Sequence, residues 1–263
     1  MWKWKTDADD PKGVIIIVHG AAEYHGRYKW LVEMWKLAGY HVVMGDLPGQ
    51  GTTTRRRGHI QSFDEYIIEL NEWIDEAASY HLPIFLLGHS MGGLVVIRAL
   101  QEEKHKNIQA VLLSSPCLGT LYKPNKALNL ASIGLNKLAP SFKVESNLSI
   151  EMATRNKEVQ DADQNDSLYV TKVSVRWYRE LLKAIEEAHK KVDSFQEVPL
   201  LVMQGGDDKI VDKASVKEWF NKVDLLEKSY KEWVGLYHEI FSEPEREDVF
   251  DVAKRFFDAH VSN

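Results

Sequence analysis

The most informative part of the chain is Ile84-Phe85-Leu86-Leu87-Gly88-His89-Ser90-Met91-Gly92-Gly93-Leu94. Its apolar first half is typical of a strand, and a turn centred on Ser90 connects it to the helix-like run Leu94 to Leu100. Side chains at positions 88 and 92 would clash in so tight a turn, and glycine stands at both. The pattern G-x-S-x-G between a strand and a helix predicts a nucleophile elbow, which holds a serine hydroxyl above the C-terminal edge of a parallel sheet. The alternative is a glycine-rich connection with a bystander serine.

Length and composition limit the classes of protein to which this chain can belong. With 263 residues and 44% hydrophobic content, it suits one large α/β domain or a core with a lid. A net charge of −6 does not favour a nucleic-acid partner. The N-terminus has no signal-peptide core, and no apolar run approaches the roughly 20 residues of a membrane span. A single cysteine, Cys117, excludes an internal disulfide and fits a reducing compartment, so we expect a soluble cytoplasmic protein.

Strand-like and helix-like runs alternate on both sides of the elbow. This β-α-β-α order predicts a mostly parallel, doubly wound sheet with right-handed crossovers, flanked by helices on both faces. We expect strands at 14–18, 41–45, 84–87, 110–114, 200–203 and 230–233, and helices at 27–37, 62–80, 94–100, 215–222 and 245–260.

The alternation stops between residues 117 and 198. No convincing strand occurs there, and two helical stretches, 126–138 and 173–191, are separated by polar segments. In the first of them an apolar stripe indicates either the core of a cap or a wall for an acyl chain; its members are Leu128, Ala131, Leu135 and Leu138. We therefore predict an α/β core made of residues 1–116 and 199–263, with 117–198 as a helical cap that covers the serine.

A serine hydroxyl needs a positioned base, and that base needs a carboxylate to hold its tautomer. On a nucleophile-elbow sheet these groups follow in the order Ser, Asp or Glu, His. His238 lies in a loop directly after a strand, whereas His260 is at the end of the last helix, so His238 is the candidate base. For the acid, the loop after the strand at 200–203 offers Asp207 and Asp208, and spacing alone does not separate them.

An acyl-transfer site also needs two hydrogen-bond donors for the oxyanion of its tetrahedral intermediate. One is the backbone N–H of Met91, the residue after the nucleophile. The other should come from the loop His19-Gly20-Ala21-Ala22 that follows the strand at 14–18. Ala21 is the better candidate, because Gly20 lets the chain bend inward, and Ala22 is the alternative.

Taken together, these motifs resemble the α/β-hydrolase group of monoacylglycerol lipases and lysophospholipases, most of all its phospholipase-type members found in Bacillus. The resemblance covers nearly the whole chain, with Tyr24 and Gln50 at positions where members usually have histidine. It implies a catalytic triad of Ser90, Asp208 and His238, with Ala21 and Met91 as the oxyanion donors and no cofactor or metal. It rests on His19-Gly20-Ala21-Ala22-Glu23-Tyr24-His25-Gly26-Arg27-Tyr28, Asp46 to Gly51, Gly88 to Gly93, Gly205-x-x-Asp208-x-Ile210-Val211 and His238-Glu239.

The expected function is hydrolysis of carboxylic esters of glycerolipids (monoacylglycerol, lysophospholipid or phospholipid) through an acyl-enzyme. Two alternatives remain: hydrolysis of another acyl bond (thioester, amide or peptide), and a non-catalytic relative that binds a small apolar ligand. The expected partner is a small-molecule lipid ester, with transient contact to a membrane surface and no obligate protein partner. The run Arg55-Arg56-Arg57 is either a solvated loop or a binding site for phosphate or an anionic lipid surface.

Overall fold

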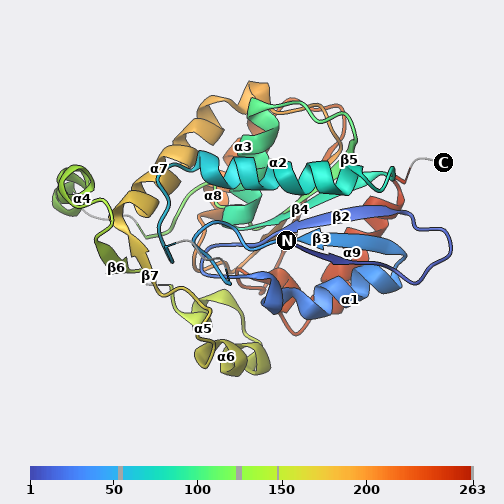
Figure 1. The fold of residues 1–263 in the computed structure, drawn as a ribbon, viewed down its shortest axis with the longest axis horizontal. Coiled ribbons are helices and arrows are strands. Elements are labelled where there is room, and N and C mark those ends of the chain that lie inside the picture. The colour runs from blue at the N-terminus through green and yellow to red at the C-terminus, as the bar shows by residue number, and fades with distance from the viewer. Residues whose placement is uncertain (53–55, 123–125, 147, 262–263) are drawn as a thin grey trace.

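The computed structural model describes residues 1–52, 56–122, 126–146 and 148–261, apart from the side chains of 126–128. Its centre is a seven-stranded sheet in the order β1-β3-β2-β4-β5-β8-β9 (Figure 1). The edge strand β1 pairs antiparallel with β3, and the other neighbours pair parallel, which confirms the predicted sheet. The strands are β1 (Trp2–Trp4), β2 (Gly13–Val18), β3 (Tyr40–Met44), β4 (Ile84–His89), β5 (Ile108–Ser114), β8 (Leu200–Gly205) and β9 (Lys228–Trp233). Strand β1, only three residues long, was not predicted.

Helices cover both faces of this sheet (Figure 1). On one face, side chains of α1 (Lys29–Leu37) and α9 (Arg246–Asp258) pack against the strands. On the other face lie α2 (Asp64–Ala78), α3 (Met91–Glu102) and α8 (Lys213–Lys222). The α/β part also contains the short 3-10 helices η1 (His25–Tyr28) and η3 (Ile240–Ser242).

The central strands are apolar along their whole length because helices cover both of their faces. In β2, residues Val14 to Val18 are all fully buried. Ile15 and Ile17 belong to the core beneath α1 and α9, whereas Val14, Ile16 and Val18 belong to the core beneath α2 and α3. Strand β4 lies between β2 and β5, so the turn that follows it emerges in the middle of the C-terminal edge of the sheet.

The segment between β5 and β8 contains more regular structure than its sequence suggests. Two short strands, each of three residues, pair antiparallel there, in contrast to the expectation of no strand. A strand of that length is too short to show the alternation that identifies strands in a sequence. The elements of this segment are α4 (Lys126–Leu138), β6 (Lys143–Glu145), α5 (Ile150–Ala153), α6 (Lys157–Gln164), β7 (Lys172–Ser174), α7 (Val175–Lys190) and the 3-10 helix η2 (Val192–Ser194).

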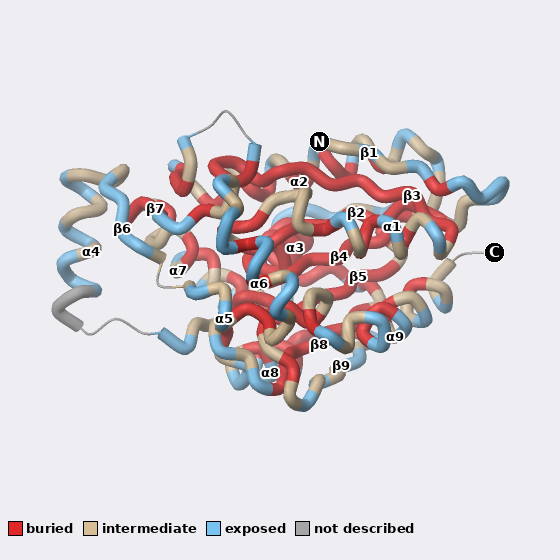
Figure 2. The backbone as a smooth tube through the Cα atoms, turned by 90° about the horizontal axis from the view of Figure 1, so that it is seen from below, coloured by how far each residue is buried: buried red, intermediate tan, exposed pale blue. Residues whose placement is uncertain are grey.

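Helix α4 stands at one end of the molecule (Figure 2). It packs against α7, which in turn packs against α3. The apolar stripe predicted on α4 is largely exposed rather than buried: Ala131 is exposed, Leu135 is half-buried and Leu138 is 89% exposed. The side chain of Leu128, the fourth member, lies outside the described residues. In the part of the chain that the structure describes, α7 covers one side of α4, and most of the stripe lies outside this contact.

Across the described ranges, no helix combines the length and the apolar character that crossing a membrane requires.

Candidate active site

Ser90 occupies the turn between β4 and α3 in a backbone conformation that non-glycine residues rarely adopt, with φ 52° and ψ −118°. The backbone at two positions of this turn lies so close to neighbouring atoms that a side chain would not fit. A Cβ at position 92 would lie 2.1 Å from the carbonyl oxygen of Val18, and one at position 88 would lie 2.8 Å from the carbonyl oxygen of Gly92. Glycine is therefore required at both places. Part of the crowding comes from the neighbouring strand β2, and part from the turn itself.

The structure brings Ser90, His238 and Asp208 together from three separate parts of the chain. His238 lies in the loop between β9 and η3, with Nε2 2.8 Å from Ser90 Oγ. Its Nδ1 lies 2.8 Å from Asp208 Oδ2, which follows β8. His260, the other candidate base, contacts Glu227 after the end of α9. The serine, the imidazole and the carboxylate thus form one continuous hydrogen-bonded line.

The two neighbouring aspartates have different surroundings. Asp208 has a fully buried side chain, and its Oδ1 accepts the N–H groups of Ile210 and Val211, each at 2.9 Å. Asp207 is exposed. Burial alone would raise the pKa of Asp208, but His238 and the two N–H groups lower it below its ordinary value. Asp208 therefore stays ionised beside the imidazole.

The pKa of His238 has opposing causes. Burial alone would lower it, but the negative charge of Asp208 and the hydrogen bond to it raise the pKa above the ordinary value. An imidazole with a carboxylate on Nδ1 is held with Nε2 free to accept a proton from the serine hydroxyl.

Two backbone N–H groups are available beside Ser90. Ala21 lines the small cavity at the serine, and Met91 is the first residue of α3. Within the described ranges, neither N–H has a protein acceptor. Ala22 has a positive φ of 71°, and its N–H donates to Gln50 Oε1 at 3.1 Å. Its N–H is therefore already used to hold the loop.

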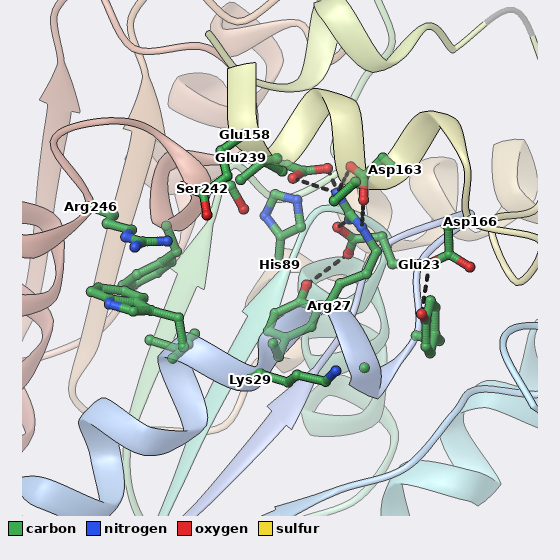
Figure 3. A pocket seen from close by; sticks show the side chains of 18 residues that line it. Glu23, Arg27, Lys29, His89, Glu158, Asp163, Asp166, Glu239, Ser242 and Arg246 are labelled. Atoms are coloured by element: carbon green, nitrogen blue, oxygen red, sulfur yellow. Dashed lines mark hydrogen bonds and ion pairs between the residues drawn. The ribbon is translucent and has the colours of Figure 1, made fainter. Parts of the chain in front are cut away.

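A buried charged cluster adjoins the line of three residues. Arg27, in η1, forms ion pairs with three carboxylates: Glu23 after β2, Asp163 in α6, and Glu239 next to the candidate base (Figure 3). Its guanidinium lies 2.9 Å from Asp163 Oδ1 and 3.0 Å from Glu239 Oε2. Arg27 therefore joins the oxyanion loop, the histidine loop and α6. None of these four residues was predicted from the sequence to have a role. The four-residue spacing from Glu23 to Arg27, which suits an ion pair on a helix, was a signal that could have suggested part of the cluster.

Glu23 and Glu239 share Arg27 but differ in their other donors. Glu23 Oε2 accepts the Gly20 N–H at 2.6 Å and the Tyr28 hydroxyl at 2.7 Å. Burial alone would raise the pKa of Glu23, but the charge of Arg27 and the hydrogen bond from Tyr28 lower it. Burial, reinforced by the nearby charge of Glu23, raises the pKa of Glu239 despite Arg27. Of this pair, Glu239 is thus the one that takes up a proton first.

Two cavities meet at this cluster. The larger, of about 420 Å³, opens between η1, α6 and the start of α9 (Figure 3). The smaller, of about 20 Å³, lies over Ser90 and is roofed by Leu148, Ala153 and Tyr169. Glu23, His89 and Glu239 line both cavities.

In the described part of the chain, Glu23, His89 and Glu239 are also the one set of side chains whose spacing could suit a metal ion, with ligand atoms within 4.8 Å of one another. Arg27 already pairs with both carboxylates. The third member, His89, places Nδ1 3.1 Å from the Ser114 carbonyl oxygen, and burial lowers its pKa to about 4. We therefore assign the role of countercharge to Arg27 and no metal to this group.

Two further features of the sequence are the arginine run at 55–57 and the single cysteine, Cys117. The Arg57 guanidinium donates to the carbonyl oxygens of Gly51 and Leu168, at 2.5 and 2.6 Å, and so ties its loop to the segment before β7. Arg56 is exposed, and Arg55 lies outside the described residues. The Cys117 thiol is buried, which raises its pKa to about 12. A thiol with so high a pKa is not a nucleophile at neutral pH.

The fold and the arrangement around Ser90 are those of a serine hydrolase built on an α/β sheet. The family described as "Serine aminopeptidase, S33" matches residues 9–245, and the chain belongs to this family. It is 65% identical to phospholipase YtpA of Bacillus subtilis, over 99% of this chain and 100% of that protein. It is 30% identical to a monoacylglycerol lipase of Mycolicibacterium smegmatis, over 98% and 92% of the two chains.

A solved structure shows the same architecture. The monoacylglycerol lipase of Paleococcus ferrophilus superposes with a TM-score of 0.88 at 28% identity, covering 98% of each chain. These similarities confirm the predicted α/β-hydrolase fold and the predicted family, and they make the chain a carboxylic ester hydrolase.

Proposed function

We propose that the chain hydrolyses carboxylic esters of glycerolipids, with Ser90 as nucleophile, His238 as general base and Asp208 as the carboxylate that orients it. This proposal rests on two contacts of 2.8 Å each, one between Ser90 Oγ and His238 Nε2 and one between His238 Nδ1 and Asp208 Oδ2. The class of substrate is supported by the relatives, which are named phospholipase and monoacylglycerol lipase.

The proposed reaction has two halves. Ser90 Oγ attacks the acyl carbonyl carbon while its proton moves to His238 Nε2, and the N–H groups of Ala21 and Met91 hold the oxyanion. The intermediate collapses, His238 returns the proton to the departing alcohol, and an acyl-enzyme remains. Water then attacks the acyl carbonyl with His238 as base, which releases the fatty acid and restores Ser90.

A fluorophosphonate probe and a substrate panel test this proposal. We expect the probe to label the wild type and not Ser90→Ala, and His238→Ala to be labelled far more slowly. The panel compares monoacylglycerol, lysophosphatidylcholine and phosphatidylglycerol with a short water-soluble ester and an aminoacyl anilide. The lipids should be hydrolysed fastest. Absence of labelling would contradict the enzyme assignment, and preference for the anilide would favour a peptidase.

We also propose that residues 117–198 act as a cap that must move during the reaction. The cavity over Ser90, of about 20 Å³, is far below the roughly 300 Å³ at which ligand pockets begin. The roof is tied down at several points: Asp163 pairs with Arg27, the Asp166 carboxylate accepts the Tyr24 hydroxyl at 2.6 Å, and the Glu239 N–H donates to the Ala153 carbonyl. An acyl glycerol can enter only when these contacts open.

We propose that the outer side of this cap makes transient contact with a lipid surface. Large apolar side chains are exposed on α4 and on the segments that flank it. Clusters of this kind on one end of a protein are typical of surfaces that meet a membrane or a partner. The exposed residues are Leu121, Tyr122, Leu130, Ile133, Leu138, Phe142 and Val144.

The variant Leu130→Glu/Leu138→Glu tests the lipid contact. We expect a fall of at least about fivefold in the rate on monoacylglycerol dispersions, because two carboxylates oppose insertion into the interface. The rate on a short soluble ester should stay unchanged. Leu226→Glu is the matched control, since Leu226 is 95% exposed but lies between α8 and β9. Equal losses on both substrates would contradict the proposed lipid contact.

A further inference from the structure

Gln204 is a fully buried polar residue in a strand of apolar ones. It lies near the end of β8 and follows Leu200, Leu201, Val202 and Met203. Alternation along the strand places it on the same side as Val202, facing the core beneath α3 and α8. Burying a primary amide without full compensation is unfavourable, so its hydrogen bonds need an explanation.

The amide nitrogen of Gln204 donates to the candidate catalytic acid. Nε2 lies 2.8 Å from Asp208 Oδ2 and 3.2 Å from the carbonyl oxygen of Gly205. The oxygen Oδ2 is the same atom that contacts His238 Nδ1. With the N–H groups of Ile210 and Val211 on Oδ1, the carboxylate therefore has two partners on each oxygen.

The amide can face Asp208 in one orientation only. Turning it over would bring Oε1 against the carboxylate oxygen, acceptor against acceptor. In the orientation present, Oε1 is buried and, among the described residues, has no hydrogen-bond partner. The side chain thus leaves one buried acceptor unsatisfied while it donates to Asp208. A glutamine with a purely structural role would not need to carry this free-energy cost.

The geometry points to Gln204 as a positioning residue of the catalytic site, which rests on the proposed triad. By occupying the second lone-pair direction of Oδ2, Gln204 prevents the carboxylate from rotating away from His238. It also favours the ionised form of Asp208, because a donated hydrogen bond stabilises the negative charge. Its action on the reaction passes entirely through Asp208.

Two substitutions at this position make different predictions. Gln204→Met keeps the length and removes the donor, so kcat/KM on a short p-nitrophenyl ester should fall about tenfold, the range for a hydrogen bond to a charged group. The acid limb of the pH profile should move to higher pH, because a carboxylate with fewer donors attracts the imidazolium proton more strongly.

Gln204→Glu can donate the same hydrogen bond to Asp208 only while the new carboxyl group is protonated. The activity of this variant should therefore fall again at high pH, so that its pH profile is bell-shaped where that of the wild type has a plateau.

Gln101→Met is the matched control. Gln101 is a buried glutamine of α3 whose amide donates to the carbonyl oxygens of Ala188 and Lys191, away from the triad. It should lower the melting temperature while leaving kcat/KM and the pH profile unchanged. Thermal unfolding of all variants verifies that they are folded at the assay temperature.

The outcomes separate this inference from the assignment of the triad. If Ser90→Ala kept its activity, the triad and the role of Gln204 would both fall. If Ser90→Ala were inactive while Gln204→Met kept kcat/KM within twofold and an unmoved acid limb, the triad would stand and the inference would fail. A Gln204→Glu variant that lost activity equally at every pH would also overturn it.

Discussion

Asp208→Asn is expected to lower kcat by about 10⁴-fold, the largest effect that we predict for a conservative change in this chain. Asparagine keeps the shape of the carboxylate but carries no charge. Its amide can present a donor to Nδ1 and so favour the imidazole tautomer with the proton on Nε2. In that tautomer His238 cannot accept the proton of Ser90, with which its Nε2 is in contact at 2.8 Å. Single-turnover hydrolysis of a p-nitrophenyl ester measures the loss.

Asp207→Asn is the matched control, because the two aspartates are neighbours in the same turn. Asp207 is exposed, so its variant should keep kcat within about twofold. The reverse result, a large loss at Asp207 and a small one at Asp208, would move the role of the catalytic acid to Asp207.

Arg27→Met is expected to lower the free energy of unfolding by about 3–5 kcal/mol at pH 8, because it leaves buried carboxylates without their countercharge. Three carboxylates depend on this one guanidinium, whose side chain is only 7% exposed. Denaturant unfolding measures the change. Methionine retains most of the side-chain volume, so the loss reports mainly on charge.

The pH dependence of this deficit has a definite sign. Without Arg27, burial should hold the pKa values of the carboxylates above their values in the unfolded chain. A group with a raised pKa in the folded state favours folding below its unfolded pKa, and that contribution disappears as pH rises through the folded pKa. The deficit should therefore be smaller at pH 5 than at pH 8.

Arg246→Met provides the comparison for Arg27. Arg246 lines the same cavity as Arg27 (Figure 3). Its guanidinium carbon lies 4.5 Å from the ring centroid of Trp30. It is half-buried, so its loss should lower the unfolding free energy by at most about 1 kcal/mol. Similar deficits for the two variants would contradict a special role of the Arg27 cluster.

The core strands could be predicted because two covered faces require continuous apolar runs, and Val14 to Val18 is such a run. The three strands that were not predicted from the sequence share one property. Strands β1, β6 and β7 have three residues each, so pairing with a neighbour, not an internal pattern, defines them. The stripe on α4 was correctly seen as helical, but its exposure depends on which neighbours pack against the helix.

The residues of the candidate site also fall into those that could be predicted from the sequence and those that could not. The elbow around Ser90 and the order of the residues that follow it are local or serial features, so the sequence could nominate Ser90, His238 and two aspartates. Gln204 and the Arg27 cluster could not be nominated, because nothing in their own surroundings in the sequence shows which carboxylate each would meet. Asp163 is 136 residues from Arg27.

The parallel sheet, the strand-to-helix turn and the glycines that this turn needs could all be predicted from the residues alone, since backbone sterics and apolar periodicity act over a few residues. The tertiary structure was needed to show which aspartate meets His238, which backbone N–H groups lack a partner beside Ser90 among the described residues, and how two loops and α6 share Arg27. Those outcomes depend on burial and on distances of a few ångströms between distant segments. Burial and distance set the strength of hydrogen bonds and charges, and neither is written in the order of residues.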